Sequence, residues 1–315
     1  FSVNLAYGVT AGLDVYGSTT LLIYQDLIDA GVLPGPRTYN VGRAIFSNHN
    51  IRSKKHALTL LKRYKTHYRT NNIKAYTSGN RLQRQYIVQA SQELGIMPTT
   101  EGILDTTLGL THAIDGFAGN EHAMPVVPLH KDVVQLYAQT QIGYTPTLTT
   151  GYSGPGAYSY FFSRQSPLNN PKLNYFIPRQ FINDRARRTT WLHDSEYVFD
   201  QAAASAAKIF RAGGKIGVGS HGNLPGLGYH WELQAFAAGG LTPHEVLQLA
   251  TRSSAEVIGH LPDIGTLEVG KYADLIVFDK NPLEDIRNTE SIKYVMKNGR
   301  LYSGDELVEV QKFNE

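Results

Sequence analysis

The stretch NIKAYTSGNRLQRQYIVQASQELGIMPTTEG, residues 72–102, decides the fold class. It opens with an apolar run at 72–77 and closes with a second one at 96–102, and both have the length and composition of strands. Between them, the spacing of the apolar residues predicts a helix from Leu82 to Leu94. Two strands joined through a helix form a βαβ unit with parallel strands, so this stretch predicts an α/β protein.

The same alternation recurs along most of the chain. Five further strand-like runs lie at 8–15, 37–42, 117–122, 143–150 and 215–222. Helical patterns extend over Thr19–Ala30, Ser53–Thr70, Pro128–Thr140 and Ser195–Ala212. The runs make seven strand–helix units, whereas a closed TIM-type barrel has eight. We therefore expect residues 1–260 to form strands two to eight of a (β/α)8 barrel, with the first strand before Phe1.

Residues 151–194 interrupt this alternation with a segment rich in Tyr, Phe, Pro, Asn and Arg. The segment follows the seventh expected strand, so it should lie at the C-terminal rim of the barrel, where the loops after the strands build active sites. It is either a solvated loop insertion or a lid that forms a wall of the substrate site. Its aromatic content favours the lid.

The character of the sequence changes again after residue 260. The segments IGTLEVGKYADLIVFD (264–279) and IKYVMKNGRLY (292–302) are rich in strand-forming residues, with turns predicted at Gly265, Gly270 and Asn298-Gly299. Residues 261–315 are therefore expected to contribute strands to a small side domain.

Composition narrows the class of protein. The net charge is +3 over 315 residues, which provides no basic surface of the kind that binds nucleic acid. No apolar run reaches the roughly 18 residues of a membrane span, and the opening FSVNLAYGVT lacks the basic start and cleavage site of a signal peptide. The absence of cysteine excludes disulfides and thiolate metal sites, which leaves His, Asp, Glu and Lys as potential ligands.

Candidate catalytic side chains stand at the ends of the expected strands, where barrel enzymes carry them. Lys74, Glu101, His122 and His221 lie at the ends of strands four, five, six and eight. A hydrolytic metal site needs several nitrogen or oxygen ligands around one cation, with a position open for water. Because the strand ends of one barrel surround a common mouth, Glu101, His122 and His221 are predicted metal ligands.

Lys74 requires a different chemistry, because an ammonium group is a poor metal ligand. Burial lowers the pKa of a lysine, and the neutral amine reacts with CO₂ to give a carbamate, which is a bridging oxygen ligand. Taken singly, a strand-end lysine is more often a surface ion-pairing group, and a strand-end histidine is more often a packed core or loop residue. Their occurrence together on the strands of one barrel favours the metal site.

Other residues near the expected rim are candidates for substrate contact, namely Arg81, Tyr152 and His230. His230 lies in GLGYHWEL (226–233), just after strand eight, and it either orients substrate or caps the following helix. Trp231 and Glu232 of the same motif are expected to serve packing and the helix start. The histidines expected to be ordinary surface residues are His56, His67, His112, His193 and His260.

Three longer stretches resemble the C-terminal signature of the amidohydrolase superfamily. They are VGSHGNLPGLGYHWELQAFAAGGLTPHEVLQLATRSSAEVIG (218–259), GTLEVGKYADLIVFDKNPLEDI (265–286) and VMKNGRLY (295–302). Upstream, IKAYTSGNRLQRQ, TTEG, DGFAGNEH and YTPTL resemble the same family in the same order. The resemblance covers nearly the whole chain. It is closest to the imidazolonepropionase- and prolidase-like branch, in particular to large proteins with an amino-terminal β-propeller before the amidohydrolase domain.

The resemblance implies a (β/α)8 barrel that binds one or two divalent metal ions, commonly zinc, and hydrolyses amide, lactam or other C–N bonds. Lys74 and His122 match the family's ligand positions on strands four and six. The family's His-x-His pair belongs to strand one, which is expected before Phe1. The C-terminal strands are expected to pair with strands that precede the barrel, in a composite β-sandwich.

Two positions depart from the family's pattern. Glu101 stands where strand five usually carries His, and Ser220-His221 stand where strand eight usually carries the catalytic Asp. A neutral imidazole coordinates metal, and its pKa of about 6.5 also suits a general base. His221 is therefore predicted to be either a metal ligand or the catalytic base.

Three hypotheses for function follow. The first is a metal-dependent hydrolase of amide or other C–N bonds in small peptides or cyclic amides, with His221 as a catalytic residue. The second is an altered barrel that binds a ligand without turnover, and the third is an inactive fragment of an active parent. Expected partners are a small-molecule or short-peptide substrate, the upstream segment with its propeller, and further copies of the chain in a homo-oligomer. The propeller-linked relatives favour a periplasmic or secreted location.

Overall fold

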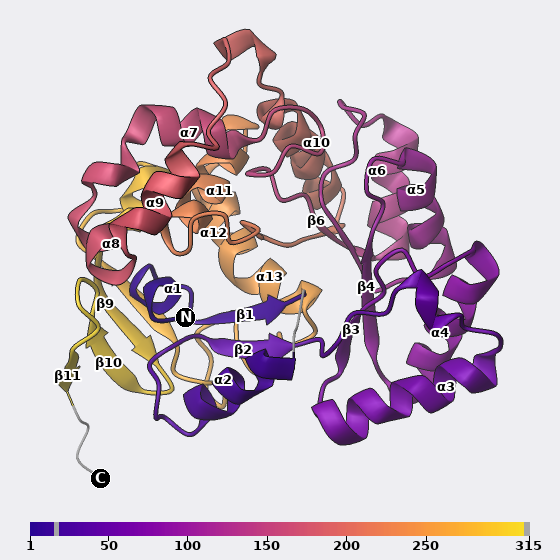
Figure 1. Cartoon of the computed structure of the whole chain (residues 1–315). Helices are drawn as coiled ribbons and strands as arrows, with labels where there is room; N and C mark the ends of the chain where they lie inside the picture. Colours follow the sequence, from indigo (N-terminus) through magenta and orange to yellow (C-terminus); the bar gives the residue numbers. More distant parts are fainter. Residues whose placement is uncertain (16–18, 312–315) are drawn as a thin grey trace.

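The seven expected strands are present, and their pairing confirms the α/β class. The computed structural model describes residues 1–15 and 19–311. The strands are β1 (Ala11–Asp14), β2 (Arg37–Asn40), β3 (Asn72–Lys74), β4 (Met97–Glu101), β5 (Gly119–Glu121), β6 (Gly143–Thr145) and β7 (Lys215–Ile216). Strands β3 to β7 form one parallel sheet in sequential order, and β1 and β2 form a second parallel pair (Figure 1). A parallel bridge between Ile45 and Ala75 connects the segment after β2 to the segment after β3.

Closure of a barrel requires pairing between its first and last strands. Among the described residues, β1 pairs only with β2, and β7 pairs only with β6. The described strands therefore form an open series, and the closed (β/α)8 barrel stays a prediction.

Helices alternate with the strands, as the βαβ pattern requires. The helices of this part are α1 (Ser2–Ala6), α2 (Thr19–Asp29), α3 (Lys54–Arg63), α4 (Arg81–Leu94), α5 (Thr106–Asp115), α6 (Lys131–Thr140), α10 (Phe199–Arg211), α11 (Leu227–Ala238), α12 (Pro243–Gln248) and α13 (Ser254–Val257). Local signals set the ends of α4, because the Asn80 side chain accepts a hydrogen bond from the Gln83 amide and Gly95 stops the helix at a φ of 61°. None of the helices in the described ranges is long and apolar enough to span a bilayer.

Residues 151–194 form a packed helical layer, so the solvated-loop alternative is wrong. The segment contains α7 (Ala157–Gln165), α8 (Pro171–Phe176) and α9 (Arg179–Ala186), which lie close together in Figure 1. Trp231 of α11 is fully buried, and its ring centre lies 5.7 Å from that of Tyr158 and 6.1 Å from that of Phe161. The aromatic residues of the segment therefore pack α7 onto α11, and a role as a lid stays a prediction.

The C-terminal region forms one antiparallel sheet in the order β11-β10-β9-β8. Its strands are β8 (Leu275–Phe278), β9 (Ile292–Lys297), β10 (Arg300–Ser303) and β11 (Glu309–Gln311). The predicted turn at Asn298-Gly299 is present, with φ angles of 52° and 76°. The strand expected from residue 264 begins only at Leu275, because Gly265 and Gly270 adopt φ angles of 95° and 96° and turn the chain instead.

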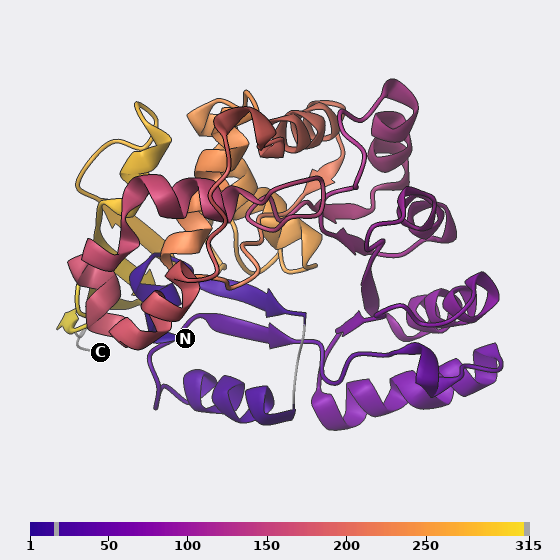
Figure 2. The same cartoon turned by 45° about the horizontal axis from the view of Figure 1, so that its top comes forward.

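This sheet packs on the first helix of the chain. Leu5 and Ala6 of α1 form a buried cluster with Ile292, Val295 and Tyr302 of the sheet. Figure 2 shows α1 beside the C-terminal strands. The described residues contain one layer of the side domain, so a β-sandwich and a domain boundary after residue 260 stay predictions. The last part of that expected domain, residues 312–315, lies outside the described residues.

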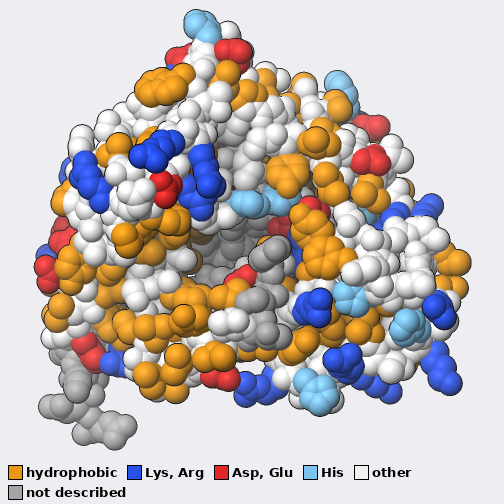
Figure 3. All heavy atoms as spheres, in the orientation of Figure 1, with side chains coloured by type: hydrophobic (Ala, Val, Ile, Leu, Met, Phe, Trp, Pro, Cys, Tyr) orange, Lys and Arg blue, Asp and Glu red, His pale blue; other side chains and the backbone are white. Residues whose placement is uncertain are grey.

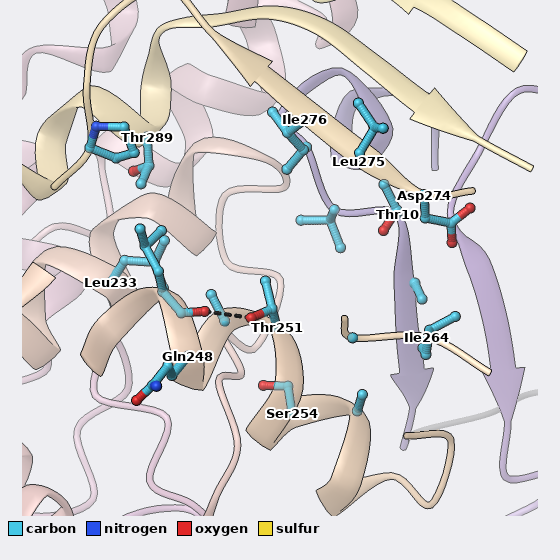
Figure 4. A pocket seen from close by; sticks show the side chains of 18 of the residues that line it. Thr10, Leu233, Gln248, Thr251, Ser254, Ile264, Asp274, Leu275, Ile276 and Thr289 are labelled. Carbon is cyan, nitrogen blue, oxygen red and sulfur yellow. Dashed lines mark hydrogen bonds between the residues drawn. The ribbon is translucent and has the colours of Figure 1, made fainter. Parts of the chain in front are cut away.

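A cavity of about 770 Å³ lies between β8 and the helices α11 to α13 (Figure 4). Its walls are mainly apolar and include Leu233, Ile264, Leu275 and Ile276. None of the four residues predicted to form the metal site lines this cavity. The cavity is therefore distinct from the strand-end site.

A chain of side-chain hydrogen bonds runs from α11 and α7 to the segment before β9. Trp231 Nε1 donates to Gln165 Oε1 at 2.5 Å, and Gln165 Nε2 donates to Gln234 Oε1 at 2.6 Å. Gln234 Nε2 then donates to Glu290 Oε1 at 2.8 Å. Burial raises the pKa of Glu290 to about 7, although the hydrogen bond from Gln234 and the charge of Lys172 oppose this.

Replacing Glu290 with glutamine is expected to flatten the pH dependence of stability. Because the folded carboxyl has a raised pKa, its favourable contribution is complete below about pH 4.5 and is lost as the pH rises through about 7. Between about pH 4.5 and 7.5, the free energy of unfolding of the wild type should fall by about 1–3 kcal/mol more than that of Glu290→Gln. Urea titrations at both pH values measure the difference. The exposed Glu306 provides the control Glu306→Gln, which should follow the wild type, and equal slopes for Glu290→Gln and the wild type would contradict the assignment.

Candidate active site

Three of the predicted metal-site residues meet at the ends of β3, β4 and β5. Lys74 is the last residue of β3, Glu101 is the last residue of β4, and His122 follows β5. These strands are neighbours in a parallel sheet, so their carboxyl ends share one edge. Oε2 of Glu101 lies 3.2 Å from Lys74 Nζ and 3.3 Å from His122 Nε2. The side chains of Lys74 and Glu101 are each 2% exposed, and that of His122 is 9% exposed.

His221, which lies beyond β7, joins this group. Its ring centre is 5.3 Å from that of His122. The two histidines have left-handed φ angles, 72° at His122 and 57° at His221, and residues with a Cβ atom adopt this conformation at a cost that is often found at functional sites. On the face shown in Figure 3 the surface is hollowed near its centre, and histidine and acidic side chains gather at the edge of the hollow.

Glu101 is held as a carboxylate. Burial acts to raise the pKa of Glu101, but the hydrogen bond from His122, the charge of Lys74 and the hydroxyl of Tyr76 outweigh burial and lower the pKa to about 2. An ionised carboxylate that is shielded from water interacts strongly with nearby positive charge. Glu101 is therefore the electrostatic centre of the group.

The surroundings of His221 favour its neutral imidazole form. Burial lowers the pKa of His221 below its ordinary value, and the charge of His122 acts in the same direction, whereas Glu101 and a hydrogen bond with Asn223 act against it. A neutral imidazole is able to accept a proton or a metal ion. Both predicted roles of His221 thus fit its surroundings.

Tyr152 forms one wall of the group. Its ring stacks on that of His122, with the ring centres 4.1 Å apart and the planes 3° from parallel. The residue stands at the start of the segment 151–194 that was predicted to form a wall of the substrate site. The structure thus brings Tyr152 together with the strand-end residues.

Arg81 and His230 do not contact the strand-end group. Arg81 Nε and Nη2 donate to Asp115 Oδ1 at 3.0 and 2.7 Å, so its guanidinium joins α4 to α5. His230 is buried, its Nε2 donates to the Tyr7 carbonyl at 3.0 Å, and its Nδ1 lies 2.9 Å from the Thr289 hydroxyl. Burial lowers the pKa of His230 to about 4, so His230 joins α11 to α1 as a neutral packed residue.

His112, which was expected at the surface, is 1% exposed. It lies on the buried face of α5 with Gly109 and Ala113, and its ring centre is 5.0 Å from that of Phe117. The periodicity of α5 decides this, because residues three or four positions apart share one face of a helix. The expected surface histidines His56, His67 and His193 are exposed.

Two residues at or near the site were not predicted to have a role there. The Tyr76 hydroxyl forms a hydrogen bond with Glu101, and Tyr76 lies two residues after Lys74. The alternation of side chains along an extended chain is the signal that would have found it, because residues i and i+2 share one side. Glu232 is 0% exposed and binds the backbone after β6. Its only signal in the sequence is one carboxylate within the largely apolar run of α11.

The oxygen and nitrogen atoms of this group are of the types that bind metal ions. Their positions do not make a complete metal site. Glu101 offers oxygen, His122 and His221 offer nitrogen, and the buried Nδ1 of His122 has no hydrogen-bond partner among the described residues. In the same part of the chain, no group of three or more His, Asp or Glu side chains is placed to hold one ion. The described residues thus supply a partial site.

Comparison with known proteins places this architecture in a family. Residues 185–302 match the model of the amidohydrolase family. Ochratoxinase from Aspergillus niger is 36% identical over 99 residues, which make up 30% of this chain and 20% of that protein. Imidazolonepropionase from Shouchella clausii is 38% identical over 64 residues, or 19% of this chain and 14% of that protein. The alignments thus span about a fifth or less of the curated relatives.

Solved structures resemble nearly the whole chain. A Xaa-Pro dipeptidase with bound methionine has a TM-score of 0.70 at 21% identity, covering 96% of this chain and 77% of that chain. A. niger ochratoxinase has a TM-score of 0.69 at 18% identity, covering 96% and 73%. These similarities support an α/β fold of the kind found in those structures. The family match over residues 185–302 and the two curated relatives support the assignment to the amidohydrolase superfamily that was made from the motifs.

Proposed function

We propose that this protein is a metal-dependent hydrolase of amide or other C–N bonds, with its reaction centre at Lys74, Glu101, His122 and His221. The observation that carries the proposal is the buried, ionised Glu101 carboxylate between Lys74 and His122 at the strand ends. A carboxylate and two imidazoles are the donor types of hydrolytic metal sites. We also propose that β1 to β7 are strands two to eight of a (β/α)8 barrel, which the similarity to amidohydrolase structures supports.

The residues divide the work of hydrolysis between them. A divalent ion such as zinc, when bound, supplies Lewis-acid activation of the substrate carbonyl and of water, and Glu101 and His122 would hold it. The neutral His221 accepts the proton of the attacking water and returns it to the leaving nitrogen. Tyr152, stacked on His122, forms a wall that orients the substrate and limits access of bulk water.

Lys74 has two alternative roles that one measurement separates. As an ammonium group it is the counter-ion that keeps Glu101 ionised and in place. As a carbamate, formed from the neutral amine and CO₂, it is an additional oxygen ligand. The mass of the intact protein under native conditions distinguishes the two, because the carbamate adds the mass of one CO₂ and Lys74→Met cannot carry it.

Small peptides or cyclic amides are the proposed substrates. The dipeptidase among the similar structures and the imidazolonepropionase among the similar sequences support this choice. A panel of dipeptides, N-acyl amino acids and lactams, assayed with the Zn²⁺-loaded protein, tests it. Hydrolysis of none of them would favour the alternative of a barrel that binds a ligand without turnover.

Metal content provides the test of the ligand assignment. Wild type, His122→Ala and His221→Ala are loaded with Zn²⁺, freed of excess ion and analysed by inductively coupled plasma mass spectrometry. We expect His122→Ala to retain less zinc than the wild type, because it lacks a donor beside Glu101. The exposed His67 provides the control His67→Ala, which should match the wild type. Unchanged stoichiometry in both His122→Ala and His221→Ala would overturn the assignment.

A further inference from the structure

Glu232 is a buried carboxylate that the proposed reaction does not use. It lies in the middle of α11, is 0% exposed, and forms no ion pair within the described ranges. Burying a carboxylate without a cation is costly unless hydrogen bonds replace its hydration. Burial raises the pKa of Glu232 to about 7, and the hydrogen bonds from Leu148 and Thr149 act against this rise. A residue that served only packing or the helix start, as expected for Glu232, would not require a carboxyl group here. The groups that bind the carboxylate therefore indicate its role.

Those groups are backbone amides of the loop after β6. The Leu148 amide donates to Oε1 of Glu232 at 2.7 Å, and the Thr149 amide donates to Oε2 at 2.9 Å. This loop is strained, because Thr147 has a φ of 53°, which a β-branched residue rarely adopts. A strained backbone persists only where its surroundings hold it in place. The two hydrogen bonds to Glu232 of the buried helix α11 hold this loop.

From this loop, contacts reach both sides of the candidate site. The Thr149 hydroxyl donates to the carbonyl of Ser220 at 3.2 Å, and Ser220 precedes His221. Three residues after Thr149, the ring of Tyr152 stacks on His122 at 4.1 Å. Glu232 thus binds Thr149 directly. Through Thr149 it is connected to Ser220, which precedes His221, and through the same loop to Tyr152, which stacks on His122.

We propose that Glu232 is a positioning residue, which holds the 147–150 loop so that His221 and Tyr152 stay in place around His122. It touches neither the substrate nor the reacting atoms. The effect of Glu232 on catalysis rests on the proposed function. The structural coupling of α11 to the 147–150 loop and to the segment before His221 does not.

Nuclear magnetic resonance tests the coupling without any substrate. In protein labelled at histidine, the ring Cε1–H signals of His122 and His221 report the surroundings of each ring. Glu232→Gln offers the Leu148 and Thr149 amides only one acceptor, so both signals should shift and broaden. Thr149→Val keeps the amide bond to Glu232 and removes the hydroxyl, which bonds the Ser220 carbonyl and also contacts Glu232. The His221 signal should therefore change more than that of His122.

Two controls separate this effect from general unfolding. The signal of His112, which is buried in α5, should stay in place in both variants. Thr140→Val changes an exposed threonine at the end of α6 and should leave every histidine signal unchanged. An unchanged His221 signal in both Glu232→Gln and Thr149→Val would overturn the proposal.

Kinetics test the catalytic consequence. With a substrate from the panel, Thr149→Val should lower kcat by about 10- to 100-fold, the effect typical of residues that orient catalytic groups, with little change in KM. Thr149→Ser, which keeps the hydroxyl, should restore kcat. A purely structural role would lower the melting temperature without lowering the kcat of the folded protein, and that result would overturn the proposal. Absence of hydrolysis in the wild type would count against the proposed function, while the resonance experiment still decides the positioning role.

Discussion

A Glu101→Leu variant is expected to lose about 3–5 kcal/mol of unfolding free energy, because the change breaks a buried ion pair and leaves the other charge unpaired. Lys74 and Glu101 lie 3.2 Å apart, and each side chain is only 2% exposed. Without the carboxylate, the buried Lys74 ammonium group loses the ion-pair partner that it has among the described residues. Urea denaturation followed by circular dichroism at neutral pH measures the loss.

Two comparisons show whether burial is the cause. The double variant Lys74→Met/Glu101→Leu removes both charges and should recover most of the stability, since apolar residues replace buried ion pairs at little cost. The exposed pair Lys54–Glu93, with side chains 46% and 51% exposed, provides the control Glu93→Leu, which should cost less than about 1 kcal/mol. A Glu101→Leu variant as stable as Glu93→Leu would contradict the prediction.

In a His122→Ala variant, kcat/KM for substrate hydrolysis is expected to be lower than in the wild type by a factor on the order of 10³, even at saturating Zn²⁺. The change removes the imidazole that lies 3.3 Å from Glu101. The ring of Tyr152 stacks on this same imidazole. The change therefore removes a proposed ligand and the support of the substrate wall together. Initial rates with a substrate from the panel measure the effect.

Tyr152→Leu separates the two contributions. This variant keeps the imidazole and removes the aromatic wall, so it should raise KM by more than it lowers kcat. His67→Ala, at an exposed position on the π-helix η2 (Tyr64–Tyr68), should keep the wild-type kcat/KM. A His122→Ala variant within about 3-fold of His67→Ala, less than the loss of a typical hydrogen bond would cause, would contradict the assignment of His122.

Most of the fold could be predicted because its signals are local. The apolar runs and helical spacing of 72–102 depend on residues a few positions apart, and β3, α4 and β4 form there within three residues of the predicted bounds. The segment from residue 264 was less predictable. Its apolar residues suit a strand, but the described residues provide no partner strand until Leu275, and a strand exists only with a partner.

The strand-end group could be anticipated for the same reason. Lys74, Glu101 and His122 follow predicted parallel strands, and parallel strands bring their carboxyl ends to one edge. The prediction that Arg81 contacts substrate was weaker. A position shortly after a strand end does not determine which partner a long side chain binds. Asp115 of α5 binds its guanidinium.

The βαβ pattern, the residues that end the strands and the resemblance to the amidohydrolase superfamily could all be inferred from the amino-acid sequence, because periodicity and motifs are properties of neighbouring residues. The contact of Glu232 in α11 with Leu148 and Thr149, which are more than 80 residues away in the chain, became visible only in the folded structure. The same holds for the hydrogen bond of Tyr76 with Glu101 and for the stacking of Tyr152 on His122. The physical reason is that hydrogen bonds and stacking require an approach of a few ångströms, and for distant residues only the packing of the whole chain creates that approach.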